Sequence, residues 1–185
     1  MSVVENTHAL LQSSGTWSVD PVHSTVEFRI RHMLVNTVKG WFRDFEGVIV
    51  TGESPSVVGT IEVESVETMN GDRDAHLRSR DFFDASRYPE IAFVADELVV
   101  NGDDTRFSLG GDLTIKGITR RIVLEGEHRG SVVDAEGKER IALTLRGKLD
   151  RSDFGLRWSP MLEAGGLLVG EDVDLSLDVA AIRVS

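Results

Sequence analysis

One short segment holds the densest group of side chains that could do chemistry. Residues 70–84 carry three arginines, four aspartates and one histidine, and two adjacent phenylalanines stand near the end of the segment. Asn70 or Asp72 can accept a hydrogen bond from the free N–H groups of a first helical turn, which predicts a short helix near residues 72–79. The residues that stand three or four apart, and so share one face of this helix, are Arg73, His76, Leu77 and Arg80. Because the phenylalanines must be buried, we expect the segment to fold back as a lid over one end of the molecule.

The histidines favour polar contacts over metal binding. The five histidines are scattered, and the chain contains no cysteine. No metal site is therefore expected, and a thiolate ligand, a disulfide and a cysteine nucleophile are excluded. His32 and His128 fall on predicted inward faces, where each is either a hydrogen-bonded core or rim residue or a contact for the head group of a ligand. The arginines of the lid either pair with neighbouring aspartates or face an anionic group.

The common catalytic and cofactor motifs are missing from the sequence. There is no G-x-S-x-G elbow, no H-E-x-x-H pattern and no dinucleotide-binding glycine pattern. Gly165 and Gly170 have the spacing of the first glycine pair of a phosphate loop, but the acidic residues that follow would repel phosphate. Trp41 and Trp158 are interpreted as packing residues rather than as a binding platform. No cofactor is expected.

Composition indicates one acidic domain of ordinary size. The chain has 185 residues and a net charge of −11, which disfavours nonspecific binding to nucleic acid or to an anionic membrane. The apolar run Ala9-Leu10-Leu11 is too short for the core of a signal peptide, and no stretch approaches the roughly 20 apolar residues of a transmembrane helix. We therefore expect a cytoplasmic protein without membrane insertion. A flexible tail is expected at residues 1–15 and a single domain at residues 16–185.

Most of the chain alternates apolar and polar residues with the period of a half-buried strand. The segments that show this pattern are 24–32, 40–50, 57–63, 91–95, 107–115, 122–128, 141–149 and 173–179. Short turns join most of them, and Asn101-Gly102-Asp103-Asp104 is a strong hairpin signal. Closure of such strands removes exposed sheet edges. We therefore expect an all-β fold, an eight-stranded antiparallel up-and-down barrel with a short helical lid.

Five small residues interrupt the apolar inward faces of the predicted strands. They are Gly59, Ala95, Gly111, Gly126 and Gly147. A barrel of about eight strands is either filled by its own side chains or wide enough to hold one ligand. If the small residues cluster, they open a tunnel lined by Val, Ile, Leu and Phe. Alternatively, each glycine marks a bend or bulge that the curvature of the barrel requires.

Five blocks of sequence, taken in order, form a recognisable set. They are Trp17-Ser18-Val19-Asp20 with His23-Ser24-Thr25-Val26-Glu27-Phe28 and His32; Gly40-Trp41-Phe42 with Phe45 and Gly47; Arg73-Asp74-Ala75-His76-Leu77-Arg78-Ser79 with Asp81-Phe82-Phe83-Asp84 and Tyr88-Pro89; Gly111-Asp112-Leu113-Thr114-Ile115-Lys116-Gly117-Ile118-Thr119; and Arg151-Ser152-Asp153-Phe154-Gly155-Leu156. With these blocks, nearly all of residues 16–184 resemble the YceI-like family of lipocalin-like polyisoprenoid-binding proteins. The resemblance implies a lipocalin-like eight-stranded barrel that holds a long isoprenoid or other lipid chain in its apolar interior, and a homodimer. The chain departs from many relatives because it shows no signal-peptide pattern and carries Lys116 where a histidine is frequent.

Three functions stay open at this point. The first is noncatalytic binding, carriage or storage of a polyisoprenoid or similar long-chain lipid. The second is an enzyme that acts on an isoprenoid quinone or lipid, with His32, His76 or His128 as acid or base. The third is a structural or stress-associated domain whose barrel is packed solid. The residues expected to contact a bound lipid are Phe28, Ile30, His32, Phe42, His76, Leu77, Phe82, Phe93, Leu113, Gly126, Leu145, Gly147 and Leu175.

Overall fold

The computed structural model describes residues 7–101, 105–160 and 168–185. The helices are α1 (Thr7–Gln12), α2 (Gly71–Arg78) and the short 3-10 helices η1 (Val63–Ser65) and η2 (Arg151–Phe154). The strands are β1 (Gly15–Val19), β2 (Thr25–His32), β3 (Asn36–Phe42), β4 (Phe45–Thr51), β5 (Ser56–Glu62), β6 (Val66–Glu67), β7 (Glu90–Asn101), β8 (Arg106–Ile115), β9 (Ile118–Val133), β10 (Glu139–Asp150) and β11 (Val169–Arg183).

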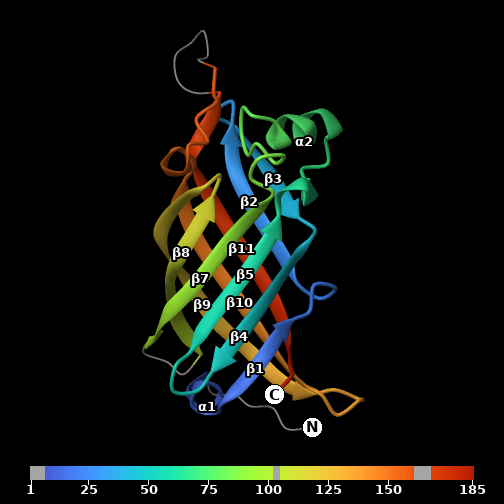
Figure 1. Ribbon diagram of the computed structural model, residues 1–185, viewed down its shortest axis with the longest axis vertical. Coiled ribbons are helices and arrows are strands. Elements are labelled where there is room, and N and C mark those ends of the chain that lie inside the picture. The colour runs from blue at the N-terminus through green and yellow to red at the C-terminus, as the bar shows by residue number, and fades with distance from the viewer. Residues whose placement is uncertain (1–6, 102–104, 161–167) are drawn as a thin grey trace.

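The strands close into an eight-stranded antiparallel barrel (Figure 1). Hydrogen-bonded neighbours follow the order β1, β4, β5, β7, β8, β9, β10 and β11, and β11 pairs with β1 to complete the ring. At the upper end of the barrel in Figure 1, β2, β3 and β6 continue the wall, because β11 pairs with β2, β2 with β3 and β3 with β6. The predicted all-β, up-and-down barrel is confirmed.

The hairpin between β8 and β9 shows how short turns connect these strands. Lys116 and Gly117 form the whole loop between the paired residues Ile115 and Ile118, and both have positive φ angles, of 51° and 74°. A two-residue loop with this backbone matches the twist of antiparallel strands. The other predicted hairpin signal, at residues 101–104, falls mainly outside the described residues.

The lower end of the barrel differs from the sequence prediction. Residues 1–15 were expected to form a flexible tail, but Thr7–Gln12 form helix α1. Leu10 is buried against Trp17 and Ile49, and the N–H of Gly52 donates to the carbonyl of Leu11 at 2.8 Å. The short apolar run in this segment therefore closes the barrel, which its length alone did not indicate.

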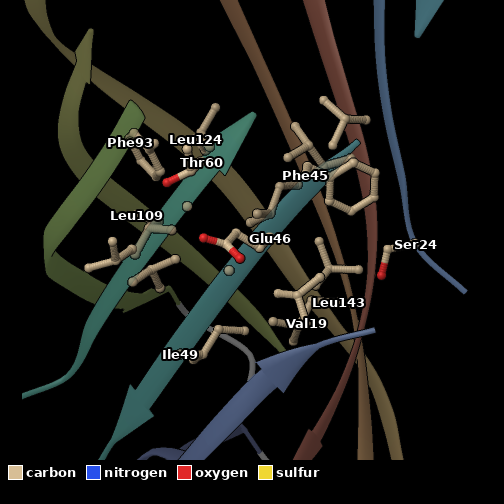
Figure 2. A pocket seen from close by; sticks show the side chains of 18 of the residues that line it. Val19, Ser24, Phe45, Glu46, Ile49, Thr60, Phe93, Leu109, Leu124 and Leu143 are labelled. Carbon is tan, nitrogen blue, oxygen red and sulfur yellow. The ribbon is translucent and has the colours of Figure 1, made fainter. Parts of the chain in front are cut away.

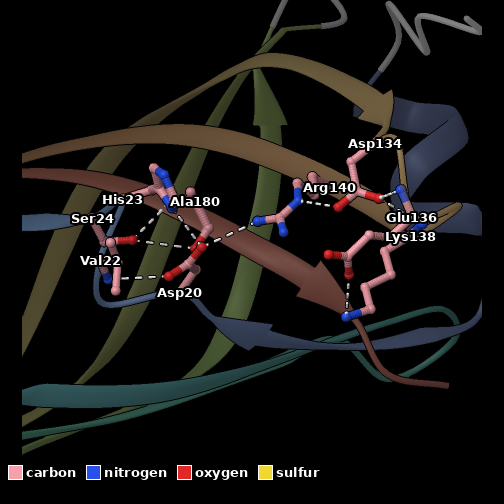
Figure 3. A network of polar contacts seen from close by, with 9 residues as sticks. All are labelled: Asp20, Val22, His23, Ser24, Asp134, Glu136, Lys138, Arg140 and Ala180. Carbon is pink, nitrogen blue, oxygen red and sulfur yellow. Dashed lines mark hydrogen bonds and ion pairs between the residues drawn. The ribbon is translucent and has the colours of Figure 1, made fainter.

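A polar network fixes the corner between β1 and β2 (Figure 3). The carboxylate of Asp20 accepts hydrogen bonds from His23 Nδ1 at 2.8 Å, from Arg140 Nη1 at 3.1 Å and from the N–H of Val22 at 3.1 Å. Arg140 Nε also donates to Asp134 at 2.6 Å. The hydrogen bond from His23 is the largest of several contacts that hold the pKa of Asp20 below its ordinary value. The network thus stabilises the ionised carboxylate and, through Arg140, ties the corner to β10.

The upper end is covered by the predicted lid helix, α2. The side chain of Asn70 accepts a hydrogen bond from the N–H of Arg73 at 3.0 Å, which caps the helix as expected. Phe82, beyond the end of the helix, is buried. The short helical insert predicted near residues 72–79 is therefore confirmed as Gly71–Arg78.

Candidate functional site

The barrel is hollow. An upper cavity of about 480 Å³ lies below α2, and a lower cavity of about 140 Å³ lies toward α1. The two cavities adjoin, since seven residues line both of them: Val26, Ile61, Ile91, Phe93, Leu113, Leu124 and Leu177. The two cavities therefore lie next to one another along the barrel interior, with the smaller one toward α1.

The exposure of the inward side chains supports this description. In a filled barrel, inward apolar residues are closely packed on every side. Here many of them are only partly buried, although they pack against the core clusters: Val26, Phe28, Ile61, Phe93, Leu175, Leu177 and Val179. Their remaining exposed surface faces the interior space, because all of them line one cavity or the other. The third function considered above, a solid barrel, is therefore not supported.

Most of the residues predicted to contact a ligand lie around the upper cavity. Those that line it are Phe28, Ile30, His32, Phe42, His76, Leu77, Phe82, Phe93, Leu113 and Leu175. Leu145 lines the lower cavity. Gly126 and Gly147 line neither.

Gly126 and Gly147, which were considered as small residues that could open a tunnel, do not widen the interior. A Cβ atom at Gly126 would stand 2.3 Å from the ring of Phe107, and a Cβ atom at Gly147 would stand 2.5 Å from Leu124 Cδ2. Neighbouring side chains therefore fill the space that each glycine leaves. Gly111 is enclosed more tightly, because a Cβ atom there would stand 2.6 Å from the backbone of the adjacent strand. These glycines allow close packing within the wall.

Gly59, by contrast, does widen the interior. It lines the lower cavity together with Gly47, its direct partner across β4 and β5. A Cβ atom at Gly59 would meet only the carbonyl oxygen of Glu46, at 3.7 Å. Figure 2 shows this cavity, with side chains from β1, β7 and β10 (Val19, Phe93 and Leu143 among them) gathered around it. Sequence reasoning named Gly59 as a small inward residue but missed the role of Gly47.

Several of the polar side chains that line the upper cavity lie at its mouth. Thr68 joins two charged residues there: its Oγ1 donates to the buried carboxylate of Asp74 at 2.5 Å and accepts from Arg73 Nε at 2.7 Å. Arg73 Nη2 also donates to the carbonyl of Thr68 at 2.8 Å. Within the described part of the chain, Arg73 makes no ion pair, so its charge is held at the mouth without a carboxylate partner. Of the two alternatives left open for the lid arginines, pairing with a neighbouring aspartate is not what positions Arg73.

His76 stands at the same mouth, among aromatic rings. Its Nε2 lies 2.8 Å from Asp81 Oδ2, and its ring packs edge-on against Trp158, with 4.4 Å between the ring centroids. The ring of Phe82 lies 5.2 Å away on another side. His76 and Trp158 both line the upper cavity, so they form part of its rim.

The third histidine considered for catalysis lies elsewhere. His128 is buried on β9 and lines neither of the two cavities. Its Nε2 lies 3.0 Å from Ser131 Oγ, and burial lowers its pKa below the ordinary value. The alternative of a core histidine with a hydrogen bond describes His128, whereas His32 lies at the rim of the upper cavity.

Arg151 is a site residue that the list of expected ligand contacts did not include. Its buried guanidinium donates to the backbone carbonyls of Gly170, Leu156, Trp158 and Val169, at 2.6 to 3.1 Å. Burial lowers its pKa below the ordinary value, and no carboxylate of the described chain lies within ion-pair distance. Arg151 therefore ties the segment that follows η2 to the start of β11. The signal that could have found it was its own sequence block, which begins with this residue.

Among the described residues, no three His, Asp or Glu side chains converge as metal ligands would. The helices that the structure describes are all too short or too polar to cross a membrane.

Comparison with known proteins places the chain in a family. Residues 17–181 match the model of the YceI-like domain. A UPF0312 protein of Staphylococcus epidermidis is 35% identical over 162 residues, which cover 85% of this chain and 91% of the relative. A UPF0312 protein of Staphylococcus aureus is 34% identical over the same shares of both chains.

Solved structures share the barrel. The YCEI protein of Campylobacter jejuni, at 31% identity, covers 84% of this chain and 90% of its own length with a TM-score of 0.69. BcnA of Burkholderia cenocepacia has 19% identity and a TM-score of 0.76 over 88% of this chain and 98% of its own. A polyisoprenoid binding domain from Saccharophagus degradans has 15% identity and a TM-score of 0.67 over 90% and 98%. The domain match and the relatives of 31–35% identity show that the chain belongs to the YceI-like family.

Proposed function

We propose that the protein binds a polyisoprenoid or a similar long-chain lipid inside the barrel, for carriage or storage and without catalysis. The observation that carries the proposal is the elongated apolar interior, whose inward Val, Leu and Phe side chains are only partly buried. Its upper cavity of about 480 Å³ falls within the range of about 300–1,000 Å³ that is typical of ligand pockets. The fold shared with a domain described as polyisoprenoid binding supports the proposal.

The two ends of the interior suggest the direction of the ligand. The lower end is closed by Leu10 and Leu11 of α1, which line the lower cavity. The upper end carries the polar groups of His32, Arg73 and His76. A polar group left without a partner in an apolar cavity is costly. The proposal therefore places the hydrocarbon chain toward α1 and the head group beneath α2.

The experiment is extraction of the purified protein with organic solvent, followed by mass spectrometry. Each methylene group removed from water contributes about 0.8 kcal/mol, so a long chain should stay bound during purification. We expect one class of long-chain lipid in near-stoichiometric amount. Protein that is folded and free of lipid, and that takes up no isoprenoid alcohol added to it, would contradict the proposal.

A second candidate, an enzyme with a rim histidine, is favoured by one observation. His76 lies at the rim of the upper cavity with its Nε2 2.8 Å from the carboxylate of Asp81, which is an arrangement that can hold an imidazole in position for proton transfer. Incubation of the protein with the extracted lipid separates the two functions. Product formation that is lost in His76→Ala would establish catalysis, whereas unchanged lipid supports carriage.

The proposal retains two expectations made from the sequence, a homodimer and a cytoplasmic location. The homodimer depends on family likeness alone. Sedimentation equilibrium across micromolar concentrations tests it, and a monomer's mass throughout would count against it. Fractionation of the source cells tests the location.

A further inference from the structure

The exposed apolar side chains are unevenly distributed. Thirteen large apolar side chains are exposed among the described residues, and nine of them are valines on strands and turns. The four that are not valine are Met33, Leu34, Met69 and Trp158, with exposed fractions of 49%, 58%, 75% and 36%. All four adjoin the mouth of the upper cavity, because Trp158 and the neighbouring residues His32 and Thr68 line it. In Figure 1 the turn between β2 and β3 and the helix α2 lie at this same end.

The backbone of these residues is also unusual. Met33 and Leu34 in the β2–β3 turn have φ angles of 53° and 64°, and Met69 has a φ angle of 60°. Glycine and asparagine adopt this left-handed region at little cost, whereas other side chains are strained there. Among the described residues, three of the five non-glycine residues with positive φ are thus exposed apolar residues at the mouth. Strain combined with exposure of apolar surface indicates a functional requirement rather than a need of the fold.

The hairpin that carries this turn is basic. Residues 28–43 contain four Lys or Arg and one His but no Asp or Glu, in a chain with 31 acidic and 20 basic residues. Glu27 pairs with Arg29 at 2.7 Å, and Glu67 pairs with Arg43. Arg31 and Lys39 make no ion pair within the described residues, although Glu171 and Asp172 of β11 share a surface hollow with Arg31. The hairpin that carries the apolar turn therefore has a net positive charge by sequence, with Arg31 and Lys39 as its cations that are unpaired among the described residues and acidic residues of β11 beside Arg31.

We propose that the mouth end of the barrel docks on the surface of a phospholipid bilayer through a docking tip formed by Met33, Leu34, Val35, Met69 and Trp158. The apolar side chains of the tip enter the boundary between head groups and acyl chains, while Arg31 and Lys39 face lipid phosphates. This inference goes beyond lipid binding in the interior, because it assigns the surface at which a lipid passes between the membrane and the cavity. The contact is peripheral and uses one end of the molecule.

Two observations favour a bilayer over a second copy of the chain. The docking tip includes the end of the basic β2–β3 hairpin, and a symmetric contact between two such tips would bring two basic hairpins together. The net charge of −11 repels the rest of the surface from anionic lipid, so docking is confined to the basic hairpin.

The test is flotation of the purified protein with vesicles of phosphatidylcholine, alone and mixed with phosphatidylglycerol. We expect the protein to bind the mixed vesicles, and added salt to weaken this binding. The double variant Met33→Asn, Leu34→Asn should lower the partition coefficient by roughly tenfold or more, since burial of a single leucine is worth at least that factor. Asparagine tolerates positive φ, so the same variant should keep or raise the melting temperature. If Met33 and Leu34 served only to stabilise the turn, the double variant would not lose vesicle binding while its melting temperature is kept or raised.

Matched variants make the result specific. Val94→Thr removes an exposed apolar group from the wall of β7, where the side chain is 50% exposed, and should leave vesicle binding unchanged. Lys39→Glu should weaken binding to the mixed vesicles more than to phosphatidylcholine alone. Unchanged binding by the double variant, or no binding of the wild-type protein to either vesicle, would overturn the proposal. So would a change in sedimentation mass of the double variant with vesicle binding intact, because the tip would then join two copies.

The bound lipid of the same samples is measured by extraction, which separates this inference from the proposed function. Wild-type protein that holds lipid but ignores vesicles overturns docking and leaves the interior site standing. Protein that binds vesicles through the tip but yields no extractable lipid supports docking and overturns the interior lipid site.

Discussion

Replacement of Gly59 by leucine tests whether the lower cavity belongs to the lipid site. Gly59 has space where its side chain would be, since a Cβ atom there would meet only a carbonyl oxygen at 3.7 Å. The adjoining cavity measures about 140 Å³. Truncation of one leucine side chain in a protein core can leave a cavity of about 150 Å³. One added leucine therefore suits the available space.

The expected effect on stability follows from two contributions. Burial of a leucine side chain contributes about 1.5–3 kcal/mol, and removal of a glycine from a strand interior adds about 0.5–1 kcal/mol. Imperfect fit offsets part of this gain, so we expect Gly59→Leu to raise the free energy of unfolding by about 1–3 kcal/mol. For a domain of this size, 1 kcal/mol shifts the melting temperature by about 2–4 °C. The lipid-free protein should thus melt roughly 3–10 °C higher.

The assay measures bound lipid and melting temperature in parallel, with Gly126→Leu as the control. At Gly126 the new side chain must displace the ring of Phe107, and such overpacking typically costs about 1–3 kcal/mol. The two variants should therefore shift the melting temperature in opposite directions, and Gly59→Leu should exclude the end of a long chain from the lower cavity without loss of stability. A Gly59→Leu variant that is less stable than the wild type would show that no room exists for a side chain at this position. A stable variant that keeps the longest lipids in full amount would show that these lipids do not reach the lower cavity.

Three other predictions concern the corner, the lid and metals. Asp20→Asn should lower the free energy of unfolding at pH 7 by about 1–3 kcal/mol, because it weakens charge-assisted hydrogen bonds. Since the folded-state pKa of Asp20 is lowered, this contribution is present above the unfolded pKa of about 3.9 and is lost as pH falls through the folded value. Urea titrations from pH 7 to 3 should therefore show the two proteins converging in acid, and a constant difference would contradict the reasoning. Thr68→Val removes the hydroxyl hydrogen bond to the buried carboxylate of Asp74, which then keeps only the bond from the N–H of residue 68. The change should cost about 2–3 kcal/mol in the same assay, whereas Thr68→Ser should not. Addition of EDTA should leave the melting temperature unchanged, and a drop of several degrees would reveal a metal site that the sequence did not predict.

The barrel itself was predictable, because strand alternation is a local property. Each inward face needs apolar residues at period 2, and this pattern survives in the sequence whatever the register. The long pairing of β10 with β11 extends over eleven residue pairs, and both strands were evident from alternation alone. Helix α1 was not predictable in the same way, since one buried leucine on a six-residue helix leaves no periodic signal.

The glycines show what strand alternation alone cannot predict, namely which residue lies opposite each glycine on the neighbouring strand. Alternation shows that a side chain is missing at Gly126 but not what fills its place. In the structure Phe107 is the direct cross-strand partner of Gly126, and Phe28 is the partner of Gly40. In each pair the phenylalanine ring covers the glycine, an arrangement known to compensate for glycines in sheets. Among the described strand residues, only Gly59 and Gly47 form a cross-strand pair of glycines. A Cβ atom at Gly47 would stand 2.9 Å from Val19 Cγ2, whereas the space beside Gly59 stays open.

The structure of the mouth was not predicted from the sequence for a different reason. Its β2–β3 turn does not carry the residue types that are usual at turn positions with positive φ. At left-handed positions, turn chemistry calls for glycine or asparagine. The β8–β9 turn follows this rule in part, with Gly117 at one of its two positions. The β2–β3 turn carries Met33 and Leu34 at such positions, so nothing in its composition indicates a tight turn. Departures from local rules are expected where function requires them. That they gather at the end where Arg73 and His76 line the cavity argues that the upper mouth, rather than the end closed by α1, is where the barrel meets its surroundings.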